Sequence, residues 1–430
     1  MKLQSLTIGL LCSGLGLIAV SCNKDDAASP TTPQAGATAA NFTVGEGDLQ
    51  LETGVLADGR IKCTYEAFTQ AIFADAATTG VAPSPCAPTA FNTALAPYVT
   101  ELNRATLAER QNYSLLSQLS QLYTYVDPAT PYFGADGSLT DFAAKTKRSL
   151  ESFWNMPNEV TLHGQHVNSL QNREAIAAVY RNFSTASEQA AYANADFIIA
   201  NYVLPSTVFK TSPLLALDGF ATTGLTTRTG KVVGDLIVIG DGLVQVMNEA
   251  GVNKQVTFAG ILGHEWAHQI QFNNYEAWYG PRVNTAEQTR MTELEADLLS
   301  SYYLTHKRGA TYNWKSSAEF FKLFFNIGDC SFISEGHHGT PNQRMAASRL
   351  GWIIAQETMP MGHILTAQET HDLFIASLQS IIDNKIDSSA AMANLKTPQL
   401  KAVFGKIVER EREVKSILTG QLNSTAIENL

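Results

Sequence analysis

The stretch Gly263-His264-Glu265-Trp266-Ala267-His268-Gln269 governs the interpretation of the whole chain. It lies in a segment with helical periodicity, and residues four apart on a helix share one face, so His264 and His268 can present two imidazole nitrogens to one ion. Glu265 would then lie beside that ion, close enough to take a proton from water. This pattern is typical of zinc-dependent hydrolysis, although a solvated surface helix can carry the same residues. A third ligand is needed to separate the two interpretations.

Two carboxylates in the next predicted helix supply that evidence. The helix is expected over residues 285–307 and opens with a capping pattern at Thr285. Glu293 and Asp297 lie four apart on one stripe of it, so one can bind the metal while the other hydrogen-bonds a ligand imidazole. Glu295 points elsewhere. We expect Glu293 to be the third ligand of a two-His-one-Glu site, and Asp297 to hydrogen-bond one of the ligand imidazoles.

A family resemblance follows from three motifs that occur in order. They are His264-Glu265-Trp266-Ala267-His268-Gln269-Ile270-Gln271, Glu293-Leu294-Glu295-Ala296-Asp297 and His338-Gly339-Thr340-Pro341-Asn342-Gln343-Arg344. Over residues 230–350 the chain resembles the neutral zinc metallopeptidases, which are bacterial envelope-facing gluzincins distantly akin to thermolysin. The spacing excludes a metzincin, because Gln271 and Asn274 stand where that class needs a glycine and a third His.

The resemblance implies specific roles for these residues. One Zn²⁺ per chain would be bound by His264, His268 and Glu293. Glu265 would act as the general base and then as the general acid. The apolar run Leu236–Ile239, expected as a strand, would be the edge strand that aligns the substrate.

The donor that stabilises the developing oxyanion is expected from a polar loop after the ligand helix. His338 and Arg344 are the catalytic candidates in that loop. Arg344 can equally hold its own loop, and His337 beside His338 leaves the identity of the imidazole open.

The N-terminus has the pattern of a bacterial lipoprotein. Residues 1–21 read as a signal peptide with a short apolar run, and Ala19-Val20-Ser21-Cys22 resembles a lipoprotein cleavage box. Cys22 would become the acylated first residue, and residues 22–45 would form a flexible tether. The following Lys24-Asp25-Asp26 is similar to a surface-export signal and is equally compatible with a polar spacer. We expect a lipid-anchored protein of the bacterial cell envelope, at the outer membrane and facing the periplasm or the exterior.

Cysteine usage agrees with that location. In an oxidising compartment Cys63 and Cys86 are expected to form a disulfide. The alternative is that these two and Cys330 are buried, reduced thiols.

The expected fold class is α+β and predominantly helical. A zincin-like metallopeptidase core with a short edge sheet is expected over residues 206–345, between a helical N-terminal region at 46–205 and a helical C-terminal region at 346–430 that packs on the core. Helical patterns are expected at residues 65–78, 90–125, 139–154, 173–181, 187–203, 345–357, 367–384 and 399–418. In the N-terminal region His163 and His166 could share a helical face, and we interpret them as structural or lid residues.

The composition limits the range of partners. A formal net charge of −10 without a dense Lys/Arg cluster excludes a nucleic-acid partner and favours a protein or peptide. We therefore expect a zinc metallopeptidase that hydrolyses peptide bonds at the envelope. The alternative is a non-catalytic zincin-fold lipoprotein that serves as a binding or assembly scaffold, although a scaffold has no need of a base such as Glu265.

Overall fold

The computed structural model describes residues 54–55, 61–62, 86–127, 129–281, 285–310, 314–328, 338–358, 364–383 and 388–421. The signal peptide, Cys22, the tether and the helix expected at 65–78 lie outside the described residues. Within the described part, helices predominate over a few short strands, which confirms the predicted predominantly helical α+β class. None of the described helices combines the length and the apolarity needed to cross a membrane.

Among the described residues, a central sheet is formed by β3 (Thr161–Gln165), β7 (Leu236–Gly240) and β4 (Gly219–Thr222), in that spatial order. Strand β7 pairs parallel with β3 and antiparallel with β4. The expectation of an edge strand at Leu236–Ile239 is therefore wrong. All five residues of β7 are buried, and a continuous apolar run is typical of a strand that is covered on both faces. The edge strands are β3 and β4.

Strand β3 comes from the region that was expected to be helical, so the sheet joins the predicted N-terminal region to the predicted core. The shorter pairs β1 with β2 and β5 with β6 are antiparallel, with strands at Gly54–Val55, Ile61–Lys62, Leu225–Thr226 and Val232–Val233.

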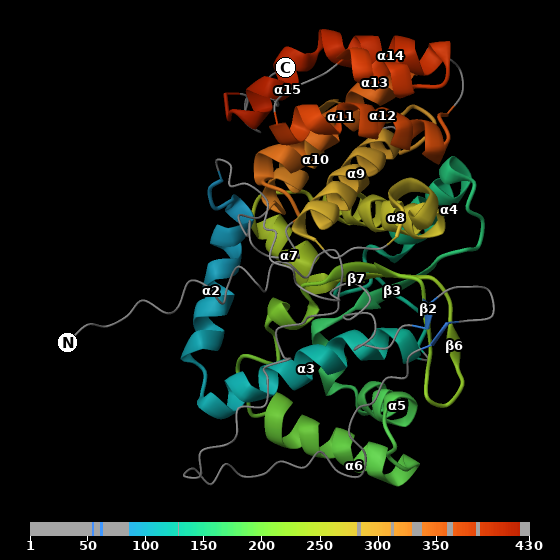
Figure 1. The fold of residues 1–430 in the computed structure, drawn as a ribbon. Coiled ribbons are helices and arrows are strands. Elements are labelled where there is room, and N and C mark those ends of the chain that lie inside the picture. Colours follow the sequence, from blue (N-terminus) through green and yellow to red (C-terminus); the bar gives the residue numbers. More distant parts are fainter. Residues whose placement is uncertain are drawn as a thin grey trace.

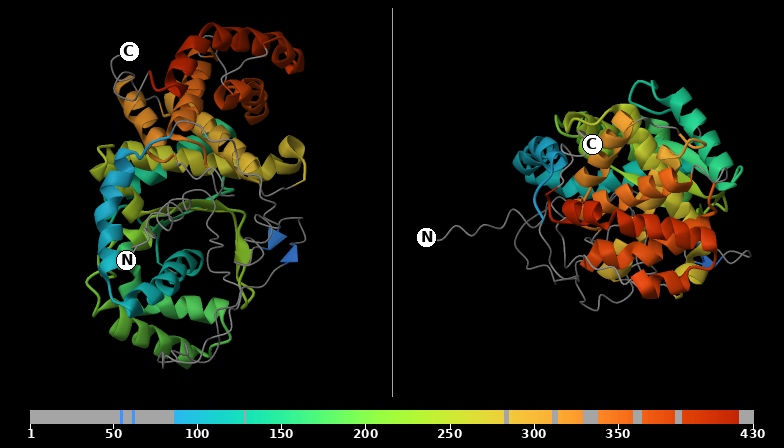
Figure 2. Two further views of the ribbon diagram at one scale, coloured as in Figure 1. Left: turned by 60° about the vertical axis from the view of Figure 1, so that its left-hand side comes forward. Right: turned by 90° about the horizontal axis from the view of Figure 1, so that it is seen from above.

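The helices of the N-terminal half are α2 (Ala90–Arg104), α3 (Leu107–Val126), α4 (Thr140–Trp154), α5 (Arg173–Phe183) and α6 (Glu188–Ile198). The pattern expected as one helix over 90–125 is two helices, because Thr106 and Glu109 form a reciprocal capping box that starts α3. Figures 1 and 2 show α3, α5 and α6 on one side of the sheet and α8 and α9 on the other. The sheet thus separates two helical layers, each with its own apolar core.

The helices next to the sheet are α7 (Asp241–Glu249), α8 (Lys254–Tyr279) and α9 (Ala286–Thr305). Helix α8 begins three residues before the expected start at Thr257, because the Asn253 side chain caps its first backbone N–H groups. Thr285 caps α9 through the N–H of Gln288, as its sequence predicts.

The C-terminal helices cover α9 on the side away from the sheet (Figure 1). They are α10 (Trp314–Asn326), α11 (Pro341–Thr358), α12 (Ala367–Asp383), α13 (Ser388–Asn394), α14 (Pro398–Glu409) and α15 (Glu411–Leu418). Gly351 lets α11 approach α9 closely, since a Cβ there would lie 2.2 Å from the Leu298 carbonyl oxygen. The segment expected as one helix over 399–418 is interrupted at Arg410.

Candidate metal centre

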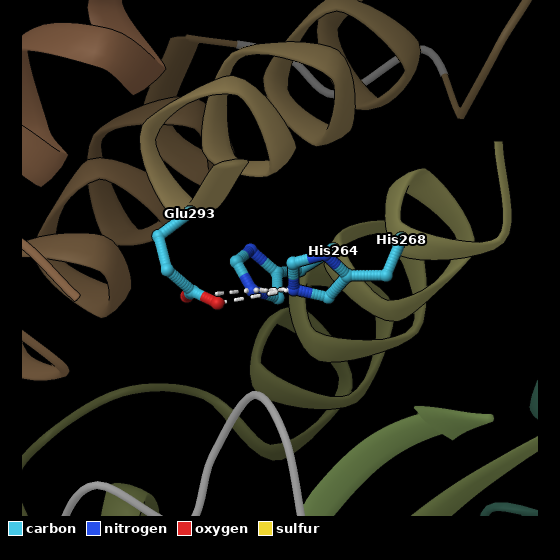
Figure 3. A group of neighbouring side chains, drawn as sticks. All are labelled: His264, His268 and Glu293. Atoms are coloured by element: carbon cyan, nitrogen blue, oxygen red, sulfur yellow. Dashed lines mark hydrogen bonds and ion pairs between the residues drawn. The ribbon is translucent and has the colours of Figure 1, made fainter. Parts of the chain in front are cut away.

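Helix α8 places two imidazoles side by side, and α9 places a carboxylate against both (Figure 3). The Nε2 atoms of His264 and His268 lie 3.1 Å apart. Glu293 Oε2 lies 3.3 Å from His264 Nε2, and Glu293 Oε1 lies 3.3 Å from His268 Nε2. All three side chains are buried. The structure therefore brings the three predicted ligands together.

The close packing of α8 on its neighbours fixes this geometry. A Cβ on Gly263, the residue before His264, would lie 2.5 Å from Ser300 Oγ, so glycine permits the near approach of α9. On the other side, the Gln269 amide donates to the carbonyl oxygens of Thr222 and Leu236, at 3.0 and 3.2 Å. These bonds tie α8 to strands β4 and β7. The ligand helix is thus held between α9 and the sheet.

Asp297 lies directly behind the first imidazole. Its Oδ1 is 2.9 Å from His264 Nδ1, and Arg344 donates to both of its carboxylate oxygens, at 2.7 Å each. A carboxylate at Nδ1 favours a proton on that nitrogen and leaves Nε2 directed at Glu293. This is the position that the predicted orienting role of Asp297 requires.

The charges in this group are strongly coupled. Burial alone would lower the pKa of His264, but Asp297 and Glu293 outweigh burial and raise that pKa to about 9. Burial would raise the pKa of Glu293, yet the charges of His338 and His268 and the contacts with both ligand imidazoles hold it well below its usual value. The ionised Glu293 carboxylate favours a positive charge between the imidazoles, and a metal ion bound there would displace the proton from His264.

The residues fit a metal ion. Among the described residues, His264, His268 and Glu293 are the group whose ligand atoms all lie within 4.8 Å of one another. Atoms bound at about 2.0–2.2 Å around a tetrahedral ion lie roughly 3.3–3.6 Å apart, close to the separations found here. Besides the two imidazoles, Arg344 Nη2 lies 3.4 Å from Glu293 Oε2, but within the described part of the chain neither Glu293 oxygen accepts a hydrogen bond of good geometry. The group could therefore bind a metal ion.

Glu265 lies beside this group and against strand β4. It is fully buried, and within the described residues neither of its oxygens has a side-chain hydrogen-bond partner. Burial raises the pKa of Glu265 well above its usual value, although the charge of His264 opposes the shift. A Cβ on Gly219 would lie 3.7 Å from Glu265 Oε1, which places the carboxyl group at the edge strand β4. An acid–base group is thus adjacent to the candidate metal ligands.

Of the two candidate oxyanion donors, Arg344 lies in the first turn of a helix, whereas His338 lies in the irregular segment that precedes it. Thr340 and Gln343 bond each other reciprocally, and Pro341 is the first residue of α11. The sequence Thr-Pro-x-Gln carries this start signal. Arg344 therefore lies in the first turn of α11. Its guanidinium forms an ion pair with Asp297 and lies 3.4 Å from Glu293 Oε2. His338 is buried and its charge acts on Glu293. A direct catalytic role for either residue stays a prediction.

His163 and His166 do not share a face. His163 belongs to strand β3, with its Nε2 3.7 Å from Asp127 Oδ2. His166 follows the strand, with its Nδ1 2.7 Å from Asp241 Oδ2 and its ring stacked on Tyr132 at 3.7 Å. The shared helical face is therefore wrong, because His163 lies in strand β3 and His166 in the extended backbone directly after it, where residues three apart point to opposite sides.

Three further side chains form a chain of contacts that begins at the ligand His268. They were not predicted from the sequence as part of the site. Gln271 contacts His268, Glu295 contacts Gln271, and His371 contacts Glu295. Of the three, only Gln271 could have been predicted from the sequence, because it lies one turn after His268 on the same helix. Cys86 is disulfide-bonded; Cys63 lies outside the described residues, so their pairing stays a prediction.

Comparison of this chain with family models, with curated proteins and with solved structures returned no match. The geometry of the site is therefore the evidence on which a functional assignment rests.

Proposed function

We propose that this protein is a zinc-dependent metallopeptidase that hydrolyses peptide bonds. The observation that supports this most is the placement of Glu265 beside the buried group of His264, His268 and Glu293. Two His, one Glu and an adjacent carboxyl group form the ligand and base set of catalytic zinc hydrolases. A purely structural ion would be satisfied by its ligands and would not need that base.

When bound, zinc would polarise a water molecule and a peptide carbonyl, which supplies the Lewis-acid part of the reaction. Glu265 then takes the proton of the attacking water on its carboxylate and delivers it to the leaving amine. The charge of His264 favours the ionised form of Glu265 that accepts the proton, whereas burial favours the protonated form that delivers it. Asp297 and Arg344 keep the His264 imidazole oriented during this exchange.

Strand β4 is the part of the sheet suited to bind an extended substrate. It is an edge strand, it lies against α8, and Gly219 brings its backbone close to Glu265. An extended peptide that pairs with such an edge would be held by main-chain hydrogen bonds with its scissile bond near the base. This role fits β4 rather than β7, because β7 is paired on both sides. All four residues of β4 are buried, so a peptide can pair there only after the site opens.

The scaffold alternative has one observation in its favour. The three ligands and Glu265 are at most 4% exposed, so the described arrangement holds the site away from solvent. A scaffold would keep such a buried group permanently closed, whereas an enzyme has to open to admit a peptide. Turnover therefore separates the two functions.

The test compares the zinc-loaded chain with Glu265→Gln on a mixture of unstructured peptides, with new peptide termini detected by mass spectrometry. We expect the parent to cleave and the variant to lose on the order of 10²–10⁴-fold in rate, because the proton acceptor is removed. Metal content is measured in both proteins and should be equal. Glu276→Gln is the matched control, since it makes the same change at an exposed position of the same helix. Equal cleavage by the parent and Glu265→Gln would refute the enzyme.

We also propose attachment to the bacterial envelope through lipid on Cys22, on the strength of the cleavage-box pattern. Cys22→Ala should move the protein from the membrane fraction to the soluble fraction of expressing bacteria. An unchanged membrane fraction would contradict the anchor.

A further inference from the structure

A continuous set of polar contacts runs from the second imidazole to the C-terminal helices. His268 Nδ1 lies 2.7 Å from Gln271 Oε1. The Gln271 amide nitrogen lies 3.4 Å from Glu295 Oε2, and Glu295 Oε1 lies 2.7 Å from His371 Nδ1. His371 belongs to α12, which is far from α8 in the sequence. The C-terminal region therefore reaches a metal ligand through two intermediate side chains.

The partners of Gln271 fix which way its amide points. Its nitrogen donates to the Thr292 carbonyl oxygen at 2.8 Å and faces the Glu295 carboxylate. Both of those partners only accept hydrogen bonds, so the amide oxygen must be the atom that faces His268. His268 Nδ1 then carries the proton, and its Nε2 lone pair is directed at the site. The tautomer needed for metal binding follows from the Gln271 orientation.

Glu295 is in turn fixed from two sides. It is fully buried and accepts a hydrogen bond from the Tyr279 hydroxyl at the end of α8. Burial and the nearby Glu295 charge raise the pKa of Tyr279 well above its usual value, so Tyr279 stays a donor. On the other side His371 donates to Glu295, and its ring stacks on Trp278 at 4.2 Å. These contacts hold the carboxylate where it faces Gln271.

We propose that His371 is a positioning residue for the metal site, acting through Glu295 and Gln271 to fix the orientation and tautomer of His268. The inference rests on the metal-binding part of the proposed function and not on peptide cleavage. It makes α12 part of the metal centre rather than a helix that only packs on the core. His264 and His268 then have separate supports, Asp297 with Arg344 for the first and Gln271 with Glu295 and His371 for the second.

The test measures the dissociation constant for Zn²⁺ in the full chain by competition with a chelator, together with the chemical unfolding of the metal-free protein. Gln271→Met should weaken zinc binding by about 10- to 100-fold, as expected for loss of an outer partner of a ligand. His371→Phe keeps the ring on Trp278 but loses the donor to Glu295, and should weaken zinc binding at least about threefold. The double variant should be no weaker than Gln271→Met alone, because both changes act on one path.

Two further variants separate positioning from general destabilisation. His371→Asn retains a donor near the Nδ1 position and should restore most of the zinc affinity lost in His371→Phe. Arg349→Met breaks the Arg349–Glu413 ion pair between α11 and α15 without touching Glu295, and should lower stability but leave zinc affinity within about twofold.

The proposal is overturned if His371→Phe lowers only the stability of the metal-free protein, or if its effect on zinc affinity adds in full to that of Gln271→Met. A parent chain that binds no zinc would refute the proposed function as well, whereas normal affinity in every variant would refute the positioning role alone.

Discussion

Two pairs of histidines, each with carboxylates nearby, have opposite outcomes in this molecule. His264 and His268 converge on one carboxylate, Glu293. His163 and His166 each meet a different carboxylate, Asp127 for the first and Asp241 for the second. Both pairs are closely spaced in the sequence, so the residue types do not account for the difference.

The local backbone conformation accounts for the difference between the two histidine pairs. A spacing of four on a helix stacks two side chains on one face, whereas a spacing of three along a strand directs them to opposite faces. In the described part of the chain the helical pair leaves the Glu293 oxygens without a hydrogen-bond partner besides the imidazoles, while Asp241 is satisfied by His166. The first arrangement therefore attracts a cation, whereas in the second each imidazole faces a carboxylate of its own.

Replacement of one histidine from each pair should give the largest contrast. His268→Ala should weaken zinc binding by more than about 100-fold, because loss of an outer partner alone already costs about 10- to 100-fold. His166→Phe keeps the stack on Tyr132 and should leave zinc affinity within about twofold. Both constants are measured by chelator competition. Similar losses in the two variants would mean that the strand pair also contributes to the site.

The ion pair between Arg344 and Asp297, behind His264, should contribute strongly to the free energy of unfolding of the metal-free protein. Arg344→Met removes the guanidinium that donates to both oxygens of the buried Asp297 and should lower the free energy of unfolding by about 3–5 kcal/mol. Arg349→Met is the control, since Arg349 is also buried but its partner Glu413 is 20% exposed and water can solvate it, so the loss should be smaller, about 1–2 kcal/mol. Urea unfolding measures both, and equal losses would contradict the account.

A further buried histidine, His306, should give the smallest effect, which is a dependence of the free energy of unfolding on pH. Burial and the charges of Arg308 and Lys307 lower the pKa of His306 to about 4, and its Nδ1 accepts the Arg308 backbone N–H. Between about pH 4 and about 6.5 the unfolded chain binds a proton that the folded chain refuses, so this contribution to stability is lost as the pH falls through that window. His306→Asn keeps an acceptor and should flatten the decline. The free energy of unfolding is measured with urea at several pH values. If it falls with pH as steeply in His306→Asn as in the parent, His306 is not the cause of the decline.

The sequence predicts the site better than it predicts the fold. Helix spacing places His264 with His268 on one face of α8, and Glu293 with Asp297 on one stripe of α9. The two-His-one-Glu pattern of zinc sites, not periodicity, predicted that these two faces meet. Strand β3 could not be expected, because its five residues become a strand only by pairing with β7, which lies much later in the chain. The contact of Glu295 with His371 likewise joins helices that are far apart in the sequence. Local patterns carry no information on such pairings.

The zinc ligands can be identified directly by X-ray absorption spectroscopy of the zinc-loaded chain and of its Glu293→Gln variant. The account predicts one zinc per chain, with two imidazoles and otherwise oxygen ligands in the parent, and markedly weaker zinc binding in the variant. A spectrum with sulfur ligands or three or more imidazoles, or full zinc binding by Glu293→Gln, would contradict the assignment of His264, His268 and Glu293.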